Sequence, residues 1–164
     1  MKPACLVLLL FQVITYIPTE SVQYVGGTVT TIPQQAEGDL NAGDENMLSF
    51  IWQKGGPSAG GEWRIPYNRV TYLGYGQHAG RRVGTSAALA PASVVLAPVF
   101  VPVMWSKKRR HYLTLAFKDD QEKPQTVIFL VGKKSIRVLP KILEVRTGIK
   151  LQYEDEEARK VGNK

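Results

Sequence analysis

Residues 111–131 read HYLTLAFKDDQEKPQTVIFLV and carry the most regular pattern in the chain. Two apolar runs, 111–117 and 125–131, lie on either side of a polar stretch that contains Asp119 and Asp120. Apolar runs of this length around a polar turn are typical of a β-hairpin. The sequence therefore predicts two antiparallel strands here.

Further β-type segments lie before and after this hairpin. β-branched and aromatic residues gather in short runs bounded by Gly, Pro, Asn and Asp, a composition typical of strands and turns. These predicted strands are residues 22–30, 38–41, 47–52, 62–67, 69–75 and 149–153.

Local signals add detail to these strands. The Gly pair within 22–30 predicts a bulge or a close approach of the backbone, and the turn cluster 44–46 predicts a hairpin between the strands that flank it. Residues 54–61 read KGGPSAGG, a composition typical of a loop. Pro66 marks the end of a short edge strand, and residues 69–75 alternate with the period of a half-buried strand.

The periodicity changes over residues 134–147, where apolar positions follow steps of three and four. This spacing predicts a helix with one apolar stripe. Ser135 is positioned to cap the helix, and Gly148 follows it as a C′ glycine does. Pro140 either kinks the helix or begins its main body, with the preceding turn separate. The stripe consists of Ile136, Leu139, Ile142, Leu143 and Arg146.

Six or seven short strands followed by one helix indicate a mostly β fold. This order matches the pleckstrin-homology-like (PH-like) fold, in which bent antiparallel sheets form a barrel and a C-terminal amphipathic helix covers its open end. The expected domain comprises residues 22–153, with an apolar insert at 83–106 and a charged, solvated tail at 154–164.

Three stretches resemble an uncharacterised family of exported bacterial proteins found notably in acidobacteria. They are IPYNRVTYLGYGQHAGRRVG (65–84), SKKRRHYLTLAFKDD (106–120) and LEVRTGIKLQYEDEEARK (143–160). The resemblance extends over about residues 38–160 and implies export and a PH-like domain. It implies no chemistry.

The N-terminus has the three regions of a secretory signal. A short basic start precedes an apolar stretch at 4–17 and a polar stretch at 18–21. Thr19 and Ser21 are small enough for a signal peptidase site, so cleavage is expected before Val22. The alternative is an uncleaved N-terminal anchor.

Composition limits the classes of function. The only cysteine, Cys5, lies in the predicted signal, so a processed chain has no disulfide or thiolate metal site. The length suits one domain. A net charge of +7 on an exported protein favours anionic lipid or cell-wall polymer as partner over nucleic acid.

The insert is the strongest functional signal. Its central part, AALAPASVVLAPVFVPVMW at 87–105, has no charged residue and is interrupted by three prolines. The apolar residues that we expect to make its contacts are Leu89, Val94, Val95, Leu96, Val99, Phe100, Val103, Met104 and Trp105. Its basic flanks, suited to lipid phosphates, are Arg81, Arg82, Lys107, Lys108, Arg109 and Arg110.

Three environments would bury the insert. A Pro-broken hairpin enters one leaflet, with Trp105 at the interface and the basic residues on lipid phosphates. A spanning helix leaves residues 107–110 in the cytosol and divides one β domain between two sides of the membrane. Packing on its own domain or on a partner leaves the basic residues solvated. Basic residues on both flanks favour the hairpin over the span.

No catalytic or metal constellation is predicted. The glycines of 74–80 lack the spacing and the following helix of a phosphate loop. His78 and His111 have no acidic neighbour to complete a metal site. The acidic pairs lie in turns or in the tail, and Ser58 is not in a nucleophile elbow.

The sequence therefore predicts a non-enzymatic binding or scaffold module of the cell envelope or periplasm, without cofactor or metal. Its expected mode is docking on anionic membrane lipid through the insert and its basic flanks. The alternative is a soluble exported protein-interaction domain whose insert is a homo-oligomer or envelope-protein interface.

Overall fold

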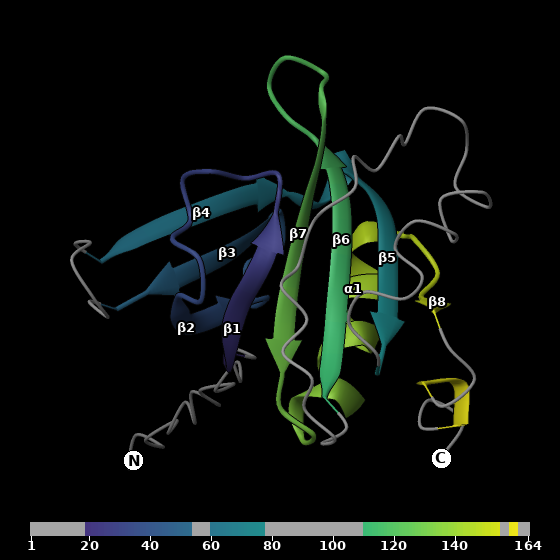
Figure 1. The fold of residues 1–164 in the computed structure, drawn as a ribbon. Helices are drawn as coiled ribbons and strands as arrows, with labels where there is room; N and C mark the ends of the chain where they lie inside the picture. The colour runs from purple at the N-terminus through teal and green to yellow at the C-terminus, as the bar shows by residue number, and fades with distance from the viewer. Residues whose placement is uncertain (1–18, 54–59, 78–109, 155–157, 161–164) are drawn as a thin grey trace, which may run out of the picture.

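The computed structural model describes residues 19–53, 60–77, 110–154 and 158–160, and shows a mostly β domain with one C-terminal helix (Figure 1). The strands are β1 (Thr19–Gly27), β2 (Glu37–Asn41), β3 (Met47–Trp52), β4 (Gly61–Pro66), β5 (Val70–Gly76), β6 (His111–Lys118), β7 (Pro124–Val131) and β8 (Gln152–Tyr153). The helical elements are η1 (Tyr67–Arg69), η3 (Ser135–Arg137) and α1 (Leu139–Thr147).

All eight strands belong to one sheet, in the order β4-β3-β2-β1-β7-β6-β5-β8. Consecutive strands of β1–β4 and of β5–β7 pair antiparallel, β1 pairs with β7, and the short β8 runs parallel to β5. The sheet is open, with β4 and β8 at its edges, so the expected closed barrel of six or seven strands is corrected. β4 is an edge strand, as predicted.

The hairpin predicted from residues 111–131 is confirmed. β6 and β7 pair from His111 opposite Val131 to Lys118 opposite Pro124. Asp119 closes the turn, because one carboxylate oxygen accepts hydrogen bonds from the backbone N–H groups of Gln121 at 2.8 Å and Lys123 at 2.9 Å.

β1 contains the predicted bulge but begins earlier than expected. Its register with β7 shifts between Tyr24 and Gly26. Gly27 has a φ of 152°, and a Cβ there would lie 2.1 Å from the carbonyl oxygen of Thr126. Only glycine permits this close approach of the two strands.

The domain extends beyond both predicted boundaries. Residues 19–21, expected to belong to the signal, pair with β2 in the sheet. At the other end, Ala158 is fully buried with the hydrophobic core, and the backbone N–H of Glu154 donates to the Tyr75 carbonyl at 2.8 Å. The expectation of a solvated tail is wrong at these two residues.

Of the two arrangements predicted from Pro140, the structure has the one in which this proline begins the main body of the helix and the preceding turn is separate. A separate 3₁₀ turn, η3, precedes α1, and Pro140 lies in the first turn of α1, where its missing N–H costs no hydrogen bond. Gly148 ends the helix with a φ of 71° and donates to the Glu144 carbonyl at 2.9 Å. Ser135 does not cap it; its hydroxyl contacts the Glu20 carboxylate instead.

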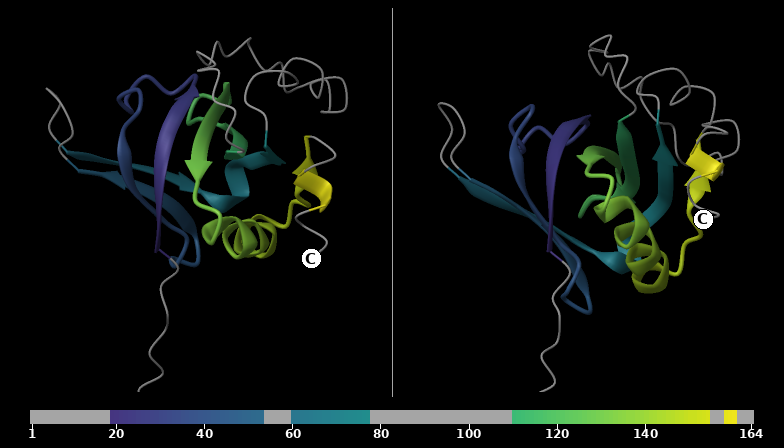
Figure 2. Two further views of the ribbon diagram at one scale, coloured as in Figure 1. Left: turned by 60° about the horizontal axis from the view of Figure 1, so that its bottom comes forward. Right: turned by 90° about the horizontal axis from the view of Figure 1, so that it is seen from below.

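The core lies between the inner face of the bent sheet and α1, which lies beside β5 in the two views of Figure 2. Leu139 and Leu143 of the predicted stripe are fully buried, whereas Arg146 is half-buried. Phe50 and Phe129 join the two halves of the sheet, with ring centroids 5.0 Å apart.

The halves of the sheet differ on the outer face. On β3 and β4, outward residues such as Ile51 and Glu62 are exposed. On β5–β7, most of the outward positions are also buried, although they do not belong to the main core. The sequence predicted that residues 69–75 would have one buried and one solvated face, and this expectation is wrong because side chains on both faces are buried. These outward residues are Tyr72, Gly74, Thr114, Ala116, Thr126 and Ile128.

We expect Leu143→Ala to lower the free energy of unfolding by about 2–5 kcal/mol, because it leaves a cavity between α1 and the sheet. Val145→Ala in the same helix is the control: Val145 is 83% exposed, and its truncation should change stability by no more than about 0.5 kcal/mol. Urea denaturation of both variants measures the difference. Equal effects would contradict this position of α1.

Candidate functional site

The insert leaves and rejoins the sheet at adjacent strand ends. β5 ends at Gly76, which pairs with Tyr112 near the start of β6. The undescribed residues 78–109 therefore connect two neighbouring positions, Gln77 and Arg110. Since one residue extends the chain by at most about 3.6 Å, Arg82 and Lys107 can lie no further than roughly 18 Å from Gln77 and Arg110, respectively.

Most predicted site residues lie outside the described residues. These are Arg81, Arg82, residues 107–109 and the nine apolar insert residues named above. Arg110 is described, lies immediately before β6, and is half-buried.

Further cations follow β7 at the same end of the sheet. His111 pairs with Val131 at the end of β7, and the next residues include Lys133, Lys134 and Arg137, all exposed. We call Arg110, Lys133, Lys134 and Arg137 the basic end. The sequence interpretation missed three of them, although the Gly-Lys-Lys that follows the predicted strand was a usable signal.

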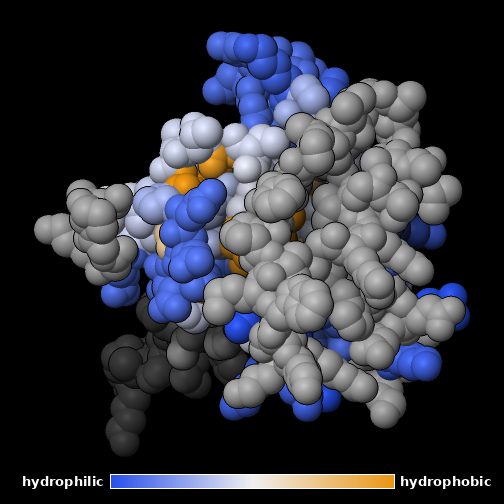
Figure 3. All heavy atoms as spheres, in the orientation of Figure 1, coloured by the Kyte–Doolittle hydropathy of each residue, from blue (hydrophilic) through white to orange (hydrophobic). Residues whose placement is uncertain are grey.

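Acidic groups lie at the opposite end of the β6–β7 hairpin. Its turn carries Asp119, Asp120 and Glu122, where Asp120 pairs with Arg69, and Glu122 pairs with Lys118 at 2.7 Å. A hydrogen bond from the Gln125 side chain and bonds from the turn backbone lower the pKa of Asp119. These carboxylates have the structural turn role that the sequence predicted, and the turn forms the hydrophilic projection at the top of Figure 3. Lys118, Lys123 and Arg69 balance its three carboxylates, so the hairpin is basic at one end and nearly neutral at the other.

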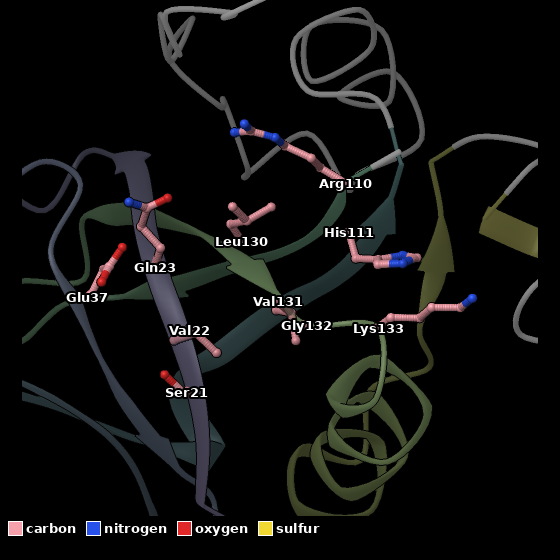
Figure 4. Close-up of a pocket in the computed structure, with 10 residues that line it drawn as sticks. All are labelled: Ser21, Val22, Gln23, Glu37, Arg110, His111, Leu130, Val131, Gly132 and Lys133. Atoms are coloured by element: carbon pink, nitrogen blue, oxygen red, sulfur yellow. The ribbon is translucent and has the colours of Figure 1, made fainter. Parts of the chain in front are cut away.

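A cavity of about 500 Å³ lies beside Arg110 (Figure 4). It is lined by β1, β2, β6, β7 and the turn after β7. The lining residues are Ser21, Val22, Gln23, Glu37, Arg110, His111, Leu130, Val131, Gly132 and Lys133.

Strand register explains which side chains meet over this cavity. Gln23 pairs with Glu37 on β2 and with Leu130 on β7, so these three form one row on the outer face. In Figure 4 the Arg110 side chain extends over Leu130 toward Gln23 and Glu37, while Lys133 points away. The cavity thus has a guanidinium on one rim and a carboxylate on the other.

His111 is occupied by a structural contact. Its Nδ1 lies 2.6 Å from the Tyr75 hydroxyl, and the two rings stack with centroids 5.9 Å apart. Burial, and then the charge of nearby Lys133, lowers the pKa of His111 below its ordinary value of 6.5. The fold therefore favours the neutral imidazole at neutral pH.

The glycine-rich stretch at 74–80, the histidines and Ser58 were weighed above as possible chemical sites, and the structure describes some of these residues. A Cβ on Gly74 would lie 2.5 Å from the Glu154 carboxylate and 2.6 Å from the Tyr72 ring, so close packing requires this glycine. Within the described ranges, no group of three or more His, Cys, Asp or Glu side chains is arranged to hold a metal ion. His78 and Ser58 lie outside those ranges.

Comparison with known proteins adds no family assignment: no protein-family model matches the chain, and no curated protein matches it. In the part of the chain that the structure describes, no helix has the length and apolar character needed to cross a membrane.

The pH dependence of stability tests the environment of His111. Because its folded-state pKa is depressed, the unfolded chain binds the proton more readily, and stability should fall as the pH drops below 6.5. We expect His111→Gln to remove this loss of stability at low pH, measured as the change in melting temperature between about pH 8 and about pH 5. His78→Gln is the matched control. If the melting temperature still falls with pH in His111→Gln but no longer falls in His78→Gln, the attribution of this effect to His111 would be contradicted.

Proposed function

We propose that this protein is an exported, non-enzymatic binding module of the cell envelope that docks on anionic membrane through its basic end. One observation carries the proposal. The pairing of Gly76 with Tyr112 and of His111 with Val131 brings Gln77 and Arg110, between which the insert lies in the sequence, and the turn after β7 to one end of the sheet.

The charge distribution supports an oriented encounter with an anionic surface. Each Lys or Arg near such a surface contributes about 1 kcal/mol, and this attraction weakens as salt is added. The turn at Asp119–Asp120, whose carboxylates are balanced by Lys118, Lys123 and Arg69, would gain no such attraction and would point away. The long hairpin β6–β7 would then stand with its basic end toward the lipid.

The order of elements supports a PH-like domain as the scaffold of this module. Two antiparallel groups of strands, joined through β1 and followed by α1, follow the expected order. Domains of this architecture serve more often as binding platforms than as enzymes, which is an argument by analogy of fold.

The adjacent positions of Gln77 and Arg110 also bear on how residues 87–105 would meet a bilayer. A single spanning helix would bring the chain back on the opposite side of the membrane, whereas these two ends lie on paired strands. A hairpin dipping into one leaflet returns the chain to the same side. We therefore propose the hairpin as the membrane-contacting element.

One second candidate is a soluble exported interaction domain. Outward side chains of β5–β7 such as Ala116 and Ile128 are buried by atoms of the chain itself, so this part of the domain satisfies its apolar surface with protein and without lipid. In that case the insert would form an interface with a second copy or with an envelope protein, and the basic residues would be solvated.

Two triple variants test the electrostatic part of the proposal. Replacing Lys133, Lys134 and Arg137 by Gln should weaken binding to anionic vesicles by about 1 kcal/mol per charge. The matched control replaces Arg69, Lys118 and Lys123, which lie at the opposite end of the hairpin, and should leave binding within about twofold of wild type. Co-sedimentation with vesicles measures both. Equal losses of vesicle binding in the two variants would mean that only the net charge matters, and would contradict docking through the basic end.

Removal of the insert separates the two candidate functions. We expect residues 19–164, which include all of β1, to float with anionic vesicles, and a version lacking 87–105 to float less. Replacing residues 107–110 by Gln should also reduce flotation. Flotation unaffected by either change would contradict membrane docking, and an insert-dependent dimer in lipid-free size-exclusion chromatography would support the interaction domain instead.

A further inference from the structure

We propose that the cavity bounded by Arg110 and Glu37 binds a phosphoethanolamine-type group, a phosphate joined by a short carbon chain to a primary ammonium. This inference deepens the proposed function and rests on it, because a membrane would supply the group as a lipid headgroup. The same chemistry also exists in free glycerophosphoethanolamine, and the experiment below distinguishes the two sources.

The size and position of the cavity suit such a group. Its volume of about 500 Å³ accommodates a phospholipid headgroup together with its glycerol. It lies beside Arg110, the residue that follows the insert, and its lining includes the outward residues Gln23, Glu37 and Leu130. A lipid surface held by the basic end would therefore present headgroups to this cavity.

The two rims carry opposite charges that are not neutralised by each other. Neither Arg110 nor Glu37 forms an ion pair within the part of the chain that the structure describes, although both line the same cavity. In Figure 4 the guanidinium lies above Leu130, and Glu37 stands beyond Gln23 on the β2 side. A ligand with an anion at one end and a cation at the other satisfies both groups.

Leu130 and Gln23 lie between the two rims in Figure 4. Leu130 supplies an apolar surface for the linking carbons, and the Gln23 amide supplies a polar contact. Gly132 lines the cavity at the end of β7, where a Cβ would meet only the Ser135 hydroxyl, at 3.6 Å.

The carboxylate determines selectivity. A guanidinium recognises phosphate through paired N–H donors, whether or not the ligand carries an amine. Glu37 repels a ligand that is only anionic and attracts one that carries an ammonium group. The cavity should therefore prefer phosphoethanolamine over phosphate or glycerol phosphate, unlike the basic end itself.

NMR titration of residues 19–164 with soluble probes tests this preference without a membrane. We expect glycerophosphoethanolamine to bind at least fivefold more tightly than glycerol phosphate or ethanolamine, and to shift resonances of Gln23 and Leu130. Arg110→Gln should weaken glycerophosphoethanolamine binding at least fivefold. Glu37→Gln should weaken it similarly and at the same time strengthen glycerol phosphate binding.

Lys118→Gln and Glu62→Gln are the matched controls, since each removes one surface charge far from the cavity, and both should bind as wild type does. Both rim side chains are on the surface, so unchanged amide spectra will show that the variants are folded. Equal affinity for glycerophosphoethanolamine and glycerol phosphate, or no shift at tens of millimolar, would overturn the inference.

Vesicle experiments separate this site from the proposed function. Adding phosphatidylethanolamine to phosphatidylglycerol vesicles should strengthen flotation of wild type and leave Glu37→Gln unaffected. Binding of the soluble probe without any flotation would support the cavity, assign the free compound as its ligand and contradict membrane docking. Flotation without probe binding would retain membrane docking and reject the cavity site.

Discussion

The pairing of β1 with β7 is the contact on which the rest of the structure depends. β1–β4 and β5–β7 are each series of neighbouring strands, and β1 alone joins them by hydrogen-bonding to β2 on one side and β7 on the other. The bulge at Tyr24–Gly26 bends the sheet at this junction, and Gly27 lets the backbones approach. The bend creates the concave face that α1 fills and the outer surface on which the cavity lies.

Local signals in the sequence predicted most of the elements but not how the two halves join. Each hairpin has its own turn chemistry, so β2–β3 and β6–β7 could be identified from short stretches. The β1–β7 register depends on residues about a hundred positions apart. The exposed β8 pairs with β5 beside a T-shaped contact between the rings of Tyr75 and Tyr153, and its parallel direction left no local signature. Pro140 allowed two helix geometries, and only packing of Leu139 and Leu143 selects one.

The candidate site was predictable in its charge but not in its shape. The basic flanks and the apolar insert are visible in the sequence, and Arg110 was among the residues selected. Lys133 and Lys134 join it only because β7 ends beside the start of β6. Glu37 is an ordinary exposed glutamate until the β1–β2 register places it across a cavity from Arg110. Sites that combine three or four strands require tertiary pairing before their chemistry can be recognised.

The insertion point between β5 and β6 has a consequence for how this domain can change. Its two ends are held together by the strand pairing itself, so the intervening segment closes a loop that the sheet already defines. Each doubling of such a loop costs only about 0.6 kcal/mol of closure entropy. Long and short versions of this connection are therefore nearly equivalent for the sheet. The β5–β6 connection is the place where the domain can acquire, exchange or lose a contact surface while its framework stays constant.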